Sequence, residues 1–207
     1  EQNGFALEKR VESEPSPRTL SLYKNNKNVI WLERIMSKKI CITGITGQVG
    51  SSLTKELLIR YPDCKIYGLK RRSSSHNTER LDNILDDPAV SSVEMVYGDL
   101  SDYSSILSFV GDVKPDYLYN CGAMSHVKVS EFLPEYCMDI VATGVIRVLE
   151  AIKKTSKHTR FLQLSSSEQF GNSVIDPEHN KQSEVTAFLP ESPYACAKVA
   201  AYHSTSY

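Results

Sequence analysis

A tyrosine and a lysine stand four residues apart in "SPYACAK", and a serine-rich stretch with one glutamate, "LSSSEQFG", precedes them in the chain. On a helix, this spacing places Tyr194 and Lys198 on the same face. A lysine in that position lowers the pKa of a phenol, which can then act as a general base near neutral pH. Ser166 can bind the substrate oxygen that Tyr194 deprotonates. Glu168 exceeds what a simple alcohol oxidation needs, so we expect a second proton transfer, such as the one in a dehydration.

Three glycines, Gly44, Gly47 and Gly50, follow a predicted strand and precede a predicted helix in "CITGITGQVG". The spacing G-x-x-G-x-x-G is a variant of the dinucleotide-binding fingerprint. Glycines allow the backbone to approach a pyrophosphate, and the N-terminus of the following helix offers N–H donors and a positive dipole end. The pattern therefore predicts dinucleotide binding, and the alternative interpretation is a tight structural turn.

Two arginines, Arg71 and Arg72, come about 20 residues after this loop, at the end of the second predicted strand, where an NAD site usually has a carboxylate. A 2′-phosphate needs cations at this place, and arginine offers several donors to phosphate oxygens. The pattern favours NADP over NAD, and the alternative is a solvated basic pair.

Other strand ends carry residues that suit the same ligand. Asp99 in "YGDLSD" can accept a hydrogen bond from an adenine amino group, and Leu100 can pack on the ring. Gly122 and Ala123 in "NCGAMSH" are small enough for the middle of a cofactor to come close. For His126 in the same motif we favour an orienting or structural role over contact with substrate.

The elements that must position these residues alternate between strand and helix. The hydrophobic periodicity predicts strands at 38–43, 65–70, 93–98, 116–122 and 160–165, and helices at 48–60, 79–86, 103–113, 131–154 and from 193 onward. Strand–helix alternation with short connections predicts an α/β fold with a doubly wound parallel sheet, Rossmann-like in type. Ligands of such sheets bind beyond the carboxyl ends of the strands, which is where the serine-rich stretch falls.

Composition excludes several classes of function. The chain has 207 residues, 41% hydrophobic and 24% charged, with a formal net charge of −1. This balance gives no case for binding nucleic acid or an anionic membrane, and no apolar run approaches the roughly 20 residues that cross a bilayer. Five cysteines, an odd number without a C-x-x-C pair, predict reduced thiols in a cytoplasmic protein and no metal site.

Two regions follow from these patterns. Residues 1–35 mix charge, proline, serine and asparagine without periodicity, so we interpret them as a disordered or non-native extension. Residues 36–207 are expected to form an NADP-binding Rossmann domain.

The motifs resemble the extended short-chain dehydrogenase/reductase family of NAD-dependent epimerases and dehydratases, and most closely its dehydratases that act on GDP-mannose. The similarity extends from Lys38 to the end of the chain and includes "GLKRRSSSHNTER" and "GAMSHVKVS", which are more specific than the glycine loop. It implies NADP-dependent conversion of GDP-D-mannose to GDP-4-dehydro-6-deoxy-D-mannose, a lyase reaction of nucleotide-sugar metabolism toward GDP-fucose. It also implies a C-terminal substrate domain that is missing from this chain, and a homo-oligomer when the protein is full length.

The resemblance assigns roles by position. It implies cofactor contacts at Gly44, Ile45, Thr46, Gly47, Gln48, Val49, Gly50, Arg71, Arg72, Ser73, Ser74, Asp99, Leu100, Cys121, Gly122, Ala123, Met124, Ser125 and Tyr136. It implies a catalytic group of Ser166, Glu168, Tyr194 and Lys198. In that scheme Tyr194 removes the O4 proton as the C4 hydride leaves, and Glu168 takes the C5 proton and assists departure of the C6 hydroxyl. The hydride then returns to C6.

Some positions differ from the family pattern. Val49 stands in place of aspartate, Met124 in place of glutamine and Ser166 in place of threonine. These differences leave room for a related nucleotide-sugar 4-epimerase or 4-keto reductase, for which Glu168→Gln would barely alter turnover. A third hypothesis is a non-catalytic NADP-binding fragment, which predicts binding without turnover.

Overall fold

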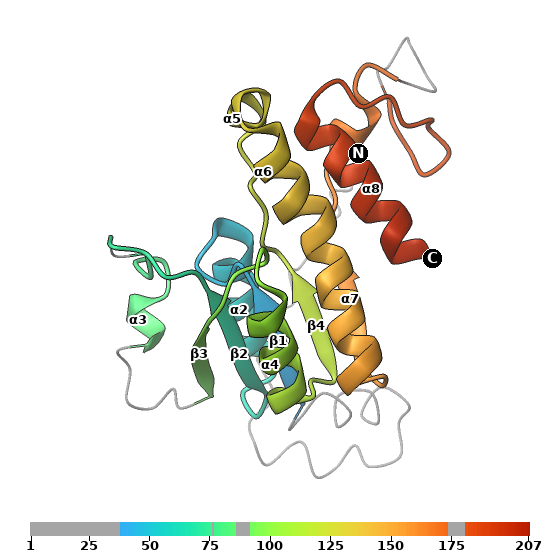
Figure 1. Ribbon diagram of the computed structural model, residues 1–207. Helices are drawn as coiled ribbons and strands as arrows, with labels where there is room; N and C mark the ends of the chain where they lie inside the picture. Colours follow the sequence, from blue (N-terminus) through green and yellow to red (C-terminus); the bar gives the residue numbers. More distant parts are fainter. Residues whose placement is uncertain (1–37, 76, 86–91, 174–180) are drawn as a thin grey trace, which may run out of the picture. The chain divides into compact units, whose positions relative to one another are not determined.

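Five parallel β-strands form the centre of the computed structural model, which describes residues 38–75, 77–85, 92–173 and 181–207 (Figure 1). The strands are β1 (Lys39–Thr43), β2 (Lys65–Lys70), β3 (Val93–Tyr97), β4 (Tyr117–Asn120) and β5 (Arg160–Gln163). Their order across the sheet is β3-β2-β1-β4-β5, and every neighbouring pair is parallel. The predicted doubly wound parallel sheet is confirmed. The prediction for residues 1–35 lies outside the described residues.

The strand register aligns the carboxyl ends of four strands at one edge. Thr43 at the end of β1 pairs with Leu69 in β2 and with Asn120 in β4, and Asn120 pairs with Gln163 in β5. The direction of strand order reverses between β1 and β4, so the topological switch point lies at this edge. A crevice at a switch point is where open α/β sheets bind ligands.

Alternating side chains of β1 build a core on each face of the sheet. Ile40 and Ile42 pack on the side covered by α2 (Gln48–Arg60) and α3 (Asp82–Leu85), together with Leu57 and Leu81. Cys41 points to the opposite side, covered by α4 (Tyr103–Val113) and α7 (Gly144–Thr155). The period of two in a strand produces this division, and both layers are needed because a parallel sheet is buried on both faces.

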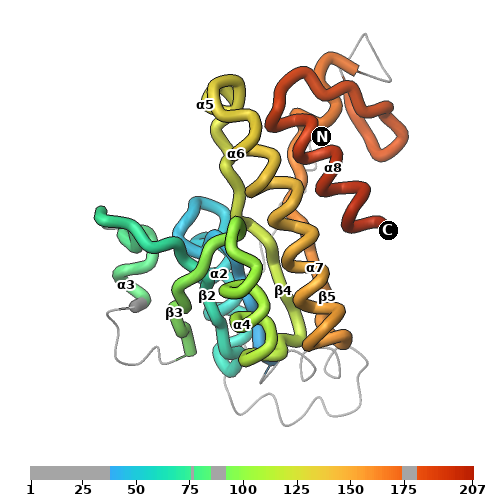
Figure 2. The backbone as a smooth tube through the Cα atoms, in the orientation of Figure 1, coloured from blue at the N-terminus to red at the C-terminus, as the bar shows by residue number. Residues whose placement is uncertain are grey.

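The single helix predicted at 131–154 begins too early. The chain first forms a separate helix α5 (Val127–Phe132), and then stays helical through α6 (Pro134–Met138), a π-helical turn η2 (Asp139–Thr143) and α7, which follow one another in Figure 2. Leu133 leaves the helical region with φ −130° and ψ 58°. The residue before a proline avoids the α conformation, and Pro134 starts the next helix, where its missing N–H costs nothing.

The last part of the domain carries the serine-rich stretch and the final helix. Strand β5 ends at Gln163, two residues earlier than predicted, and a short 3-10 helix η3 (Ser167–Phe170) follows. Helix α8 (Pro193–Ser206) begins after Ser192, whose hydroxyl accepts a hydrogen bond from the Ala195 N–H at 3.1 Å. Both elements lie at the end of the sheet that the register marks as the ligand-binding edge.

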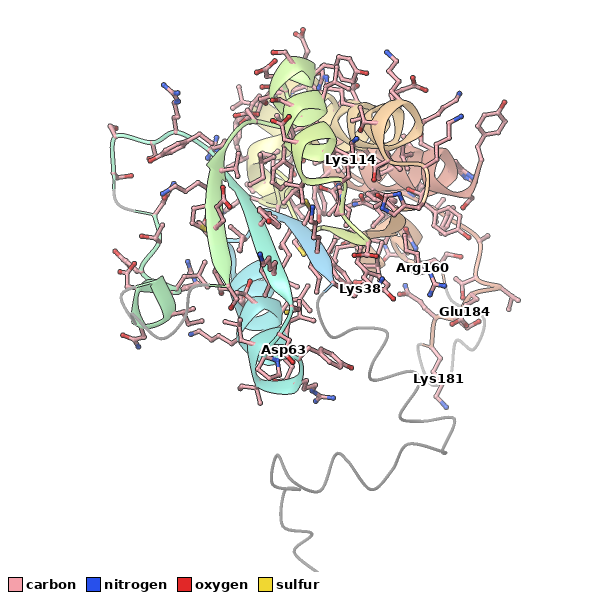
Figure 3. All side chains as sticks on the ribbon, turned by 90° about the horizontal axis from the view of Figure 1, so that it is seen from below. Lys38, Asp63, Lys114, Arg160, Lys181 and Glu184 are labelled. Carbon is pink, nitrogen blue, oxygen red and sulfur yellow. The ribbon has the colours of Figure 1, made fainter. Side chains whose placement is uncertain are left out.

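The opposite end of the sheet is bordered by charged side chains. Figure 3 views the domain from there, with Lys38, Lys114 and Arg160 next to the amino ends of β1, β4 and β5. Lys38 forms an ion pair of 2.7 Å with Asp116, which links the starts of β1 and β4. In the described part of the chain, no helix is both long enough and apolar enough to span a bilayer.

Candidate active site

The carboxyl ends of β1, β2 and β4 border a cleft with a volume of about 830 Å³. Its other walls come from the glycine-rich loop after β1, the loops after β2, β3 and β4, and residues of α6 and α8. The predicted dinucleotide-binding loop and the predicted Tyr194–Lys198 pair, although far apart in the sequence, therefore line the same cleft.

Glycine is required where the loop after β1 passes close to other backbone. Gly44 has φ +63°, and a Cβ at this position would lie 2.7 Å from the Gly122 Cα atom. A Cβ on Gly50 would collide with the Gly44 carbonyl oxygen. Helix α2 begins directly after the loop with Gly47 as its N-cap, a residue without a side chain that could cap the helix. The uncapped helix end and the space left by missing Cβ atoms suit a phosphate group.

Basic and hydroxyl side chains border the cleft after β2. Arg71 and Ser73 line it, and Arg71 donates a hydrogen bond of 3.2 Å to the Tyr136 hydroxyl. This bond joins the loop after β2 to helix α6. Arg72 instead places its guanidinium over the Tyr97 ring, 5.5 Å from the ring centroid, outside the cleft lining. The two predicted cations therefore occupy different surroundings.

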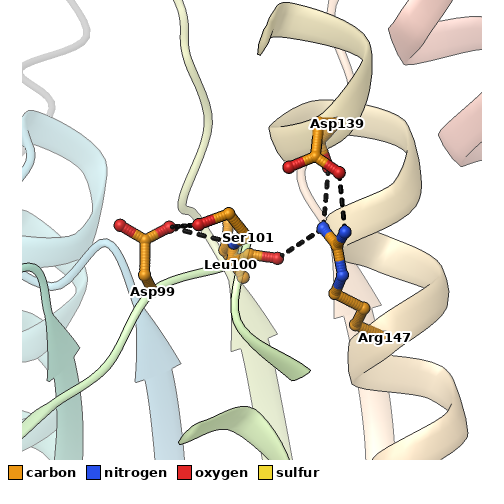
Figure 4. A network of polar contacts seen from close by, with 5 residues as sticks. All are labelled: Asp99, Leu100, Ser101, Asp139 and Arg147. Carbon is orange, nitrogen blue, oxygen red and sulfur yellow. Dashed lines mark hydrogen bonds and ion pairs between the residues drawn. The ribbon is translucent and has the colours of Figure 1, made fainter. Parts of the chain in front are cut away.

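An arginine of α7 holds the loop that follows β3. Arg147 donates to the Leu100 carbonyl oxygen at 2.9 Å and to the Asp139 carbonyl and carboxylate oxygens at 3.2 and 2.6 Å (Figure 4). In the same loop the Asp99 carboxylate accepts bonds from the Ser101 N–H and hydroxyl at 2.9 and 2.8 Å. Arg147 was not predicted as a functional residue. The sequence feature that could have indicated it is a single cation within the apolar run that precedes the charged end of the predicted helix.

The tyrosine and lysine of α8 are both buried, and other elements fix them. The Tyr194 N–H donates to the Ser130 hydroxyl of α5 at 3.2 Å. The Lys198 ammonium donates to the Leu164 carbonyl oxygen at 2.7 Å and lies 5.7 Å from the centroid of the Tyr194 ring. The two side chains lie next to each other on one face of α8, as predicted.

The electrostatics of this pair differ from the sequence expectation. Burial raises the pKa of the Tyr194 phenol, a hydrogen bond with Ser166 opposes the rise, and the nearby Cys137 and Glu168 add to it. Burial also lowers the pKa of Lys198 to about 8. The expected lowering of the phenol pKa by the lysine is therefore wrong for the protein without ligands. Burial has the larger effect on the phenol, and the ammonium lies over the ring and donates to a carbonyl oxygen.

The serine and glutamate of "LSSSEQFG" lie beside the cleft rather than in its lining. The Ser166 hydroxyl caps η3 by accepting the Glu168 N–H at 3.2 Å, and it also reaches Tyr194. Glu168 is exposed on η3, yet close enough for its charge to raise the pKa of Tyr194. The catalytic roles of Ser166 and Glu168 stay predictions.

His126 has a structural use in this geometry. It is the N-cap of α5, where its Nδ1 accepts the Val129 N–H at 3.3 Å. The cap favours the structural interpretation over contact with substrate.

Most of the residues predicted for the site come together around the cleft. Its lining includes Gly44, Thr46, Gly47, Gln48, Val49, Gly50, Arg71, Ser73, Asp99, Leu100, Cys121, Gly122, Ala123, Met124, Ser125, Tyr136, Tyr194 and Lys198. It does not include Ile45, Arg72, Ser74, Ser166 or Glu168. The Ile45 side chain is buried in the core on the α2 side of the sheet, and Ser74 is exposed.

Nine further residues line the cleft and were missed. They are Thr43, Leu69, Lys70, Ser75, Asn77, Gly98, Ile140, Leu164 and Ser165. Most of them are sequence neighbours of a predicted residue at a strand end. Their position next to predicted strand ends was the available signal, because the carboxyl ends of parallel strands meet at one edge of the sheet.

Comparisons with known proteins agree with this arrangement. The model of the family described as GDP-mannose 4,6 dehydratase matches residues 41–207. The GDP-mannose 4,6-dehydratase of Vibrio cholerae is 47% identical over 171 residues, and GDP-mannose 4,6 dehydratase 1 of Arabidopsis thaliana is 45% identical over 171 residues. These matches cover 81% and 79% of this chain but only 44% and 45% of the relatives. The chain thus spans less than half the length of these two relatives.

A solved structure shows the same fold at lower identity. The Bordetella bronchiseptica enzyme WbmH, determined in complex with NAD⁺, superposes with a TM-score of 0.67 at 25% identity. The alignment covers 82% of this chain and 52% of that one. With a family match that runs from the first strand through the Tyr–Lys helix, this chain belongs to the GDP-mannose 4,6-dehydratase family.

Proposed function

We propose that the whole protein to which this chain belongs dehydrates GDP-D-mannose to GDP-4-dehydro-6-deoxy-D-mannose with NADP as a resident cofactor. One observation carries the proposal: the glycine loop after β1 and the Tyr194–Lys198 pair of α8 line the same cleft. A dinucleotide that rests its phosphates on the loop has its other end free to reach the pair. Membership of the dehydratase family supports the choice of substrate and reaction.

The residues of the cleft suit a nicotinamide dinucleotide. The glycine loop and the N-terminus of α2 would hold the pyrophosphate, and the loop after β3 would border the adenine. Arg71 and Ser73 would contact a 2′-phosphate, which is why we favour NADP. A bound nicotinamide would accept the hydride from C4 and later donate it to C6.

The chain's own side chains would handle the protons. Burial keeps the Tyr194 phenol neutral at pH 7 in the ligand-free protein, so Tyr194 would first release its own proton. As a phenolate it would take the proton from O4 of the sugar, and the Ser166 hydroxyl, which already reaches the phenol, would orient that oxygen. Lys198 holds a positive charge beside the phenol in a site shielded from water. Glu168 would take the C5 proton and pass it to the departing C6 hydroxyl, so that water leaves. When the hydride reaches C6, the proton that Tyr194 took from O4 would go to C5.

The position of Glu168 supports a second candidate. This side chain is exposed and outside the cleft lining, and a 4-epimerase or 4-keto reductase needs no base for C5. In that reaction the tyrosine and lysine would act alone on the C4 oxygen. The two candidates differ in what Glu168→Gln does, because only the dehydratase loses its base.

The test is turnover of GDP-mannose by the whole protein, with the product identified by mass spectrometry. We expect a 4-keto-6-deoxy sugar and no net accumulation of NADPH, because the hydride returns to the product. Stoichiometric NADPH or an unchanged sugar nucleotide would count against the dehydratase. In the active protein, Glu168→Gln should lower the rate at least about 100-fold, and an unchanged rate would favour the second candidate.

A further inference from the structure

A row of hydrogen-bonded side chains runs along the carboxyl ends of β1, β4 and β5. The Thr43 hydroxyl donates to the Asn120 side-chain oxygen, and Asn120 Nδ2 donates to Gln163 Oε1 at 2.6 Å. The register lines up these three residues, because Thr43 pairs with Asn120 and Asn120 with Gln163. At the β1 end, the Gly122 N–H donates to the Thr43 hydroxyl oxygen at 3.1 Å. The row therefore begins at the backbone of Gly122, a residue of the cleft lining.

The other end of the row reaches the lysine of α8. Gln163 Nε2 donates to the Leu164 carbonyl oxygen at 2.8 Å, and Lys198 Nζ donates to the same oxygen at 2.7 Å. Each amide side chain accepts a hydrogen bond on its oxygen and donates one from its nitrogen, so its orientation is set by a partner on both sides. Thr43 and Asn120 are each 1% exposed, and an unpaired polar group at that depth is costly.

We propose that Gln163 is a positioning residue for Lys198: it holds the Leu164 carbonyl oxygen where the lysine ammonium needs its acceptor. Gln163 does not line the cleft, so it acts through Leu164, and Asn120 holds Gln163 in turn. The inference rests on the proposed function in one respect, namely that Lys198 serves catalysis.

The surroundings of Lys198 make this carbonyl important. Among the described residues, the titratable groups that face the ammonium are Cys121 directly after β4, Cys137 on α6 and Tyr194 on α8. Burial raises the pKa of both thiols and of the phenol, so all three are uncharged at neutral pH. None of them supplies a negative charge there, so the buried cation is stabilised by the hydrogen bond to the Leu164 carbonyl oxygen and by the face of the Tyr194 ring.

The test measures how the reactivity of Lys198 with acetic anhydride changes with pH, followed by peptide mass spectrometry on the whole protein. Only the neutral amine reacts, so the midpoint of the curve reports the proton affinity of Lys198 without any ligand or turnover. Gln163→Met removes the amide, and we expect the midpoint to fall by about half a pH unit or more. Gln163→Glu keeps the shape and adds a negative charge nearby, so the midpoint should rise by about one pH unit.

Kinetics supply the second readout. A displaced lysine should lower kcat of Gln163→Met about tenfold or more while KM for the sugar nucleotide stays within about twofold. The matched control is Thr159→Val, which loses hydrogen bonds to the Pro115 carbonyl and the Ser156 hydroxyl at the amino end of β5. We expect this control to change neither the midpoint nor kcat.

An unchanged midpoint in Gln163→Met, or equal shifts in Gln163→Met and Thr159→Val, would overturn the inference. If Gln163→Met does not fold, Gln163→Glu decides alone, and a midpoint that does not rise overturns the inference. Failure of the proposed function is separate: the wild-type protein would leave GDP-mannose unchanged, while the labelling curves would still decide the role of Gln163.

Discussion

The Lys198 ammonium lies over the face of the Tyr194 ring, with its nitrogen 5.7 Å from the ring centroid. A cation in this position is attracted by the ring, but the lysine is only 3% exposed, and burial lowers its pKa to about 8. A lysine that is less basic in the folded protein than in the unfolded chain opposes folding at neutral pH. The protein therefore loses some folding stability by keeping the charged Lys198 ammonium in the cleft.

Replacing this lysine by an apolar side chain of similar length should stabilise the protein. Below pH 8 both states of the wild type hold the proton, so the full cost of the buried charge is present. Between pH 8 and 10.5 the folded state releases the proton first, and the cost disappears. We expect Lys198→Met to raise the free energy of unfolding at pH 7 by up to about 3 kcal/mol. Urea unfolding at pH 7 and 9.5 checks this. A variant that is less stable by the same amount at both pH values would contradict it.

Removing the phenol hydroxyl should stop catalysis without emptying the cleft of its ligand. Tyr194→Phe keeps the ring but cannot take the O4 proton, so we expect turnover to fall at least about 1000-fold with NADPH affinity unchanged. The control is Tyr202→Phe, an exposed tyrosine eight residues later on the same helix, which contacts Phe188 and His203. Rate measurements and fluorescence titration distinguish the two variants, and equal rates would sink the assignment of the base.

A methyl group at the first glycine of the loop should prevent cofactor binding. Gly44→Ala places a Cβ at φ +63° and 2.7 Å from the Gly122 Cα atom, so the backbone must move. We expect NADPH affinity to fall at least about tenfold and the protein to lose about 1–3 kcal/mol of stability. In Gly111→Ala, within α4, the new Cβ meets Thr155 at an ordinary 3.4 Å, and this control should be neutral or slightly stabilising. Isothermal titration and thermal unfolding measure both effects.

The cofactor preference should depend on the arginine in the cleft lining. Arg71→Ala removes donors that suit a 2′-phosphate, so we expect NADPH affinity to fall about 10- to 100-fold and NADH affinity to stay within about twofold. Arg60→Ala is the control, because Arg60 pairs with Glu56 on the exposed surface of α2. Titration with both cofactors decides, and equal losses for NADPH and NADH would show that Arg71 does not read the phosphate.

Loss of the arginine that holds the loop after β3 should affect both stability and binding. Arg147→Met leaves the Leu100 carbonyl and the Asp139 carboxylate without their donor, at a cost of about 2–3 kcal/mol. NADPH should also bind several-fold more weakly, because Leu100 lines the cleft. Lys153→Met removes a looser, exposed ion pair of 3.8 Å with Glu150 on the same helix and should cost less than about 0.5 kcal/mol. Chemical unfolding measures the free energy of unfolding of both variants. An equally small loss of stability in Arg147→Met and Lys153→Met would contradict the role of the Arg147 hydrogen bonds.

Local patterns accounted for most of the fold. Alternating apolar residues predicted the strands, and the glycine spacing before Gln48 predicted the start of α2, because both depend on residues close together in the chain. The predicted helix at 131–154 began three residues too early, because the apolar pattern was given more weight than the proline within it. Pro134 stood inside that pattern, and it separates α5 from α6.

The amino-acid sequence alone was enough for the parallel sheet, for the glycine loop and for the pairing of Tyr194 with Lys198, because periodicity and spacing along one element set them. The sign of the pKa change at Tyr194, the exposed position of Glu168 and the hydrogen bonds that connect Gln163 to the lysine came only from the tertiary structure. They depend on burial and on contacts between strands and helices that are distant in the chain, and no local pattern carries that information.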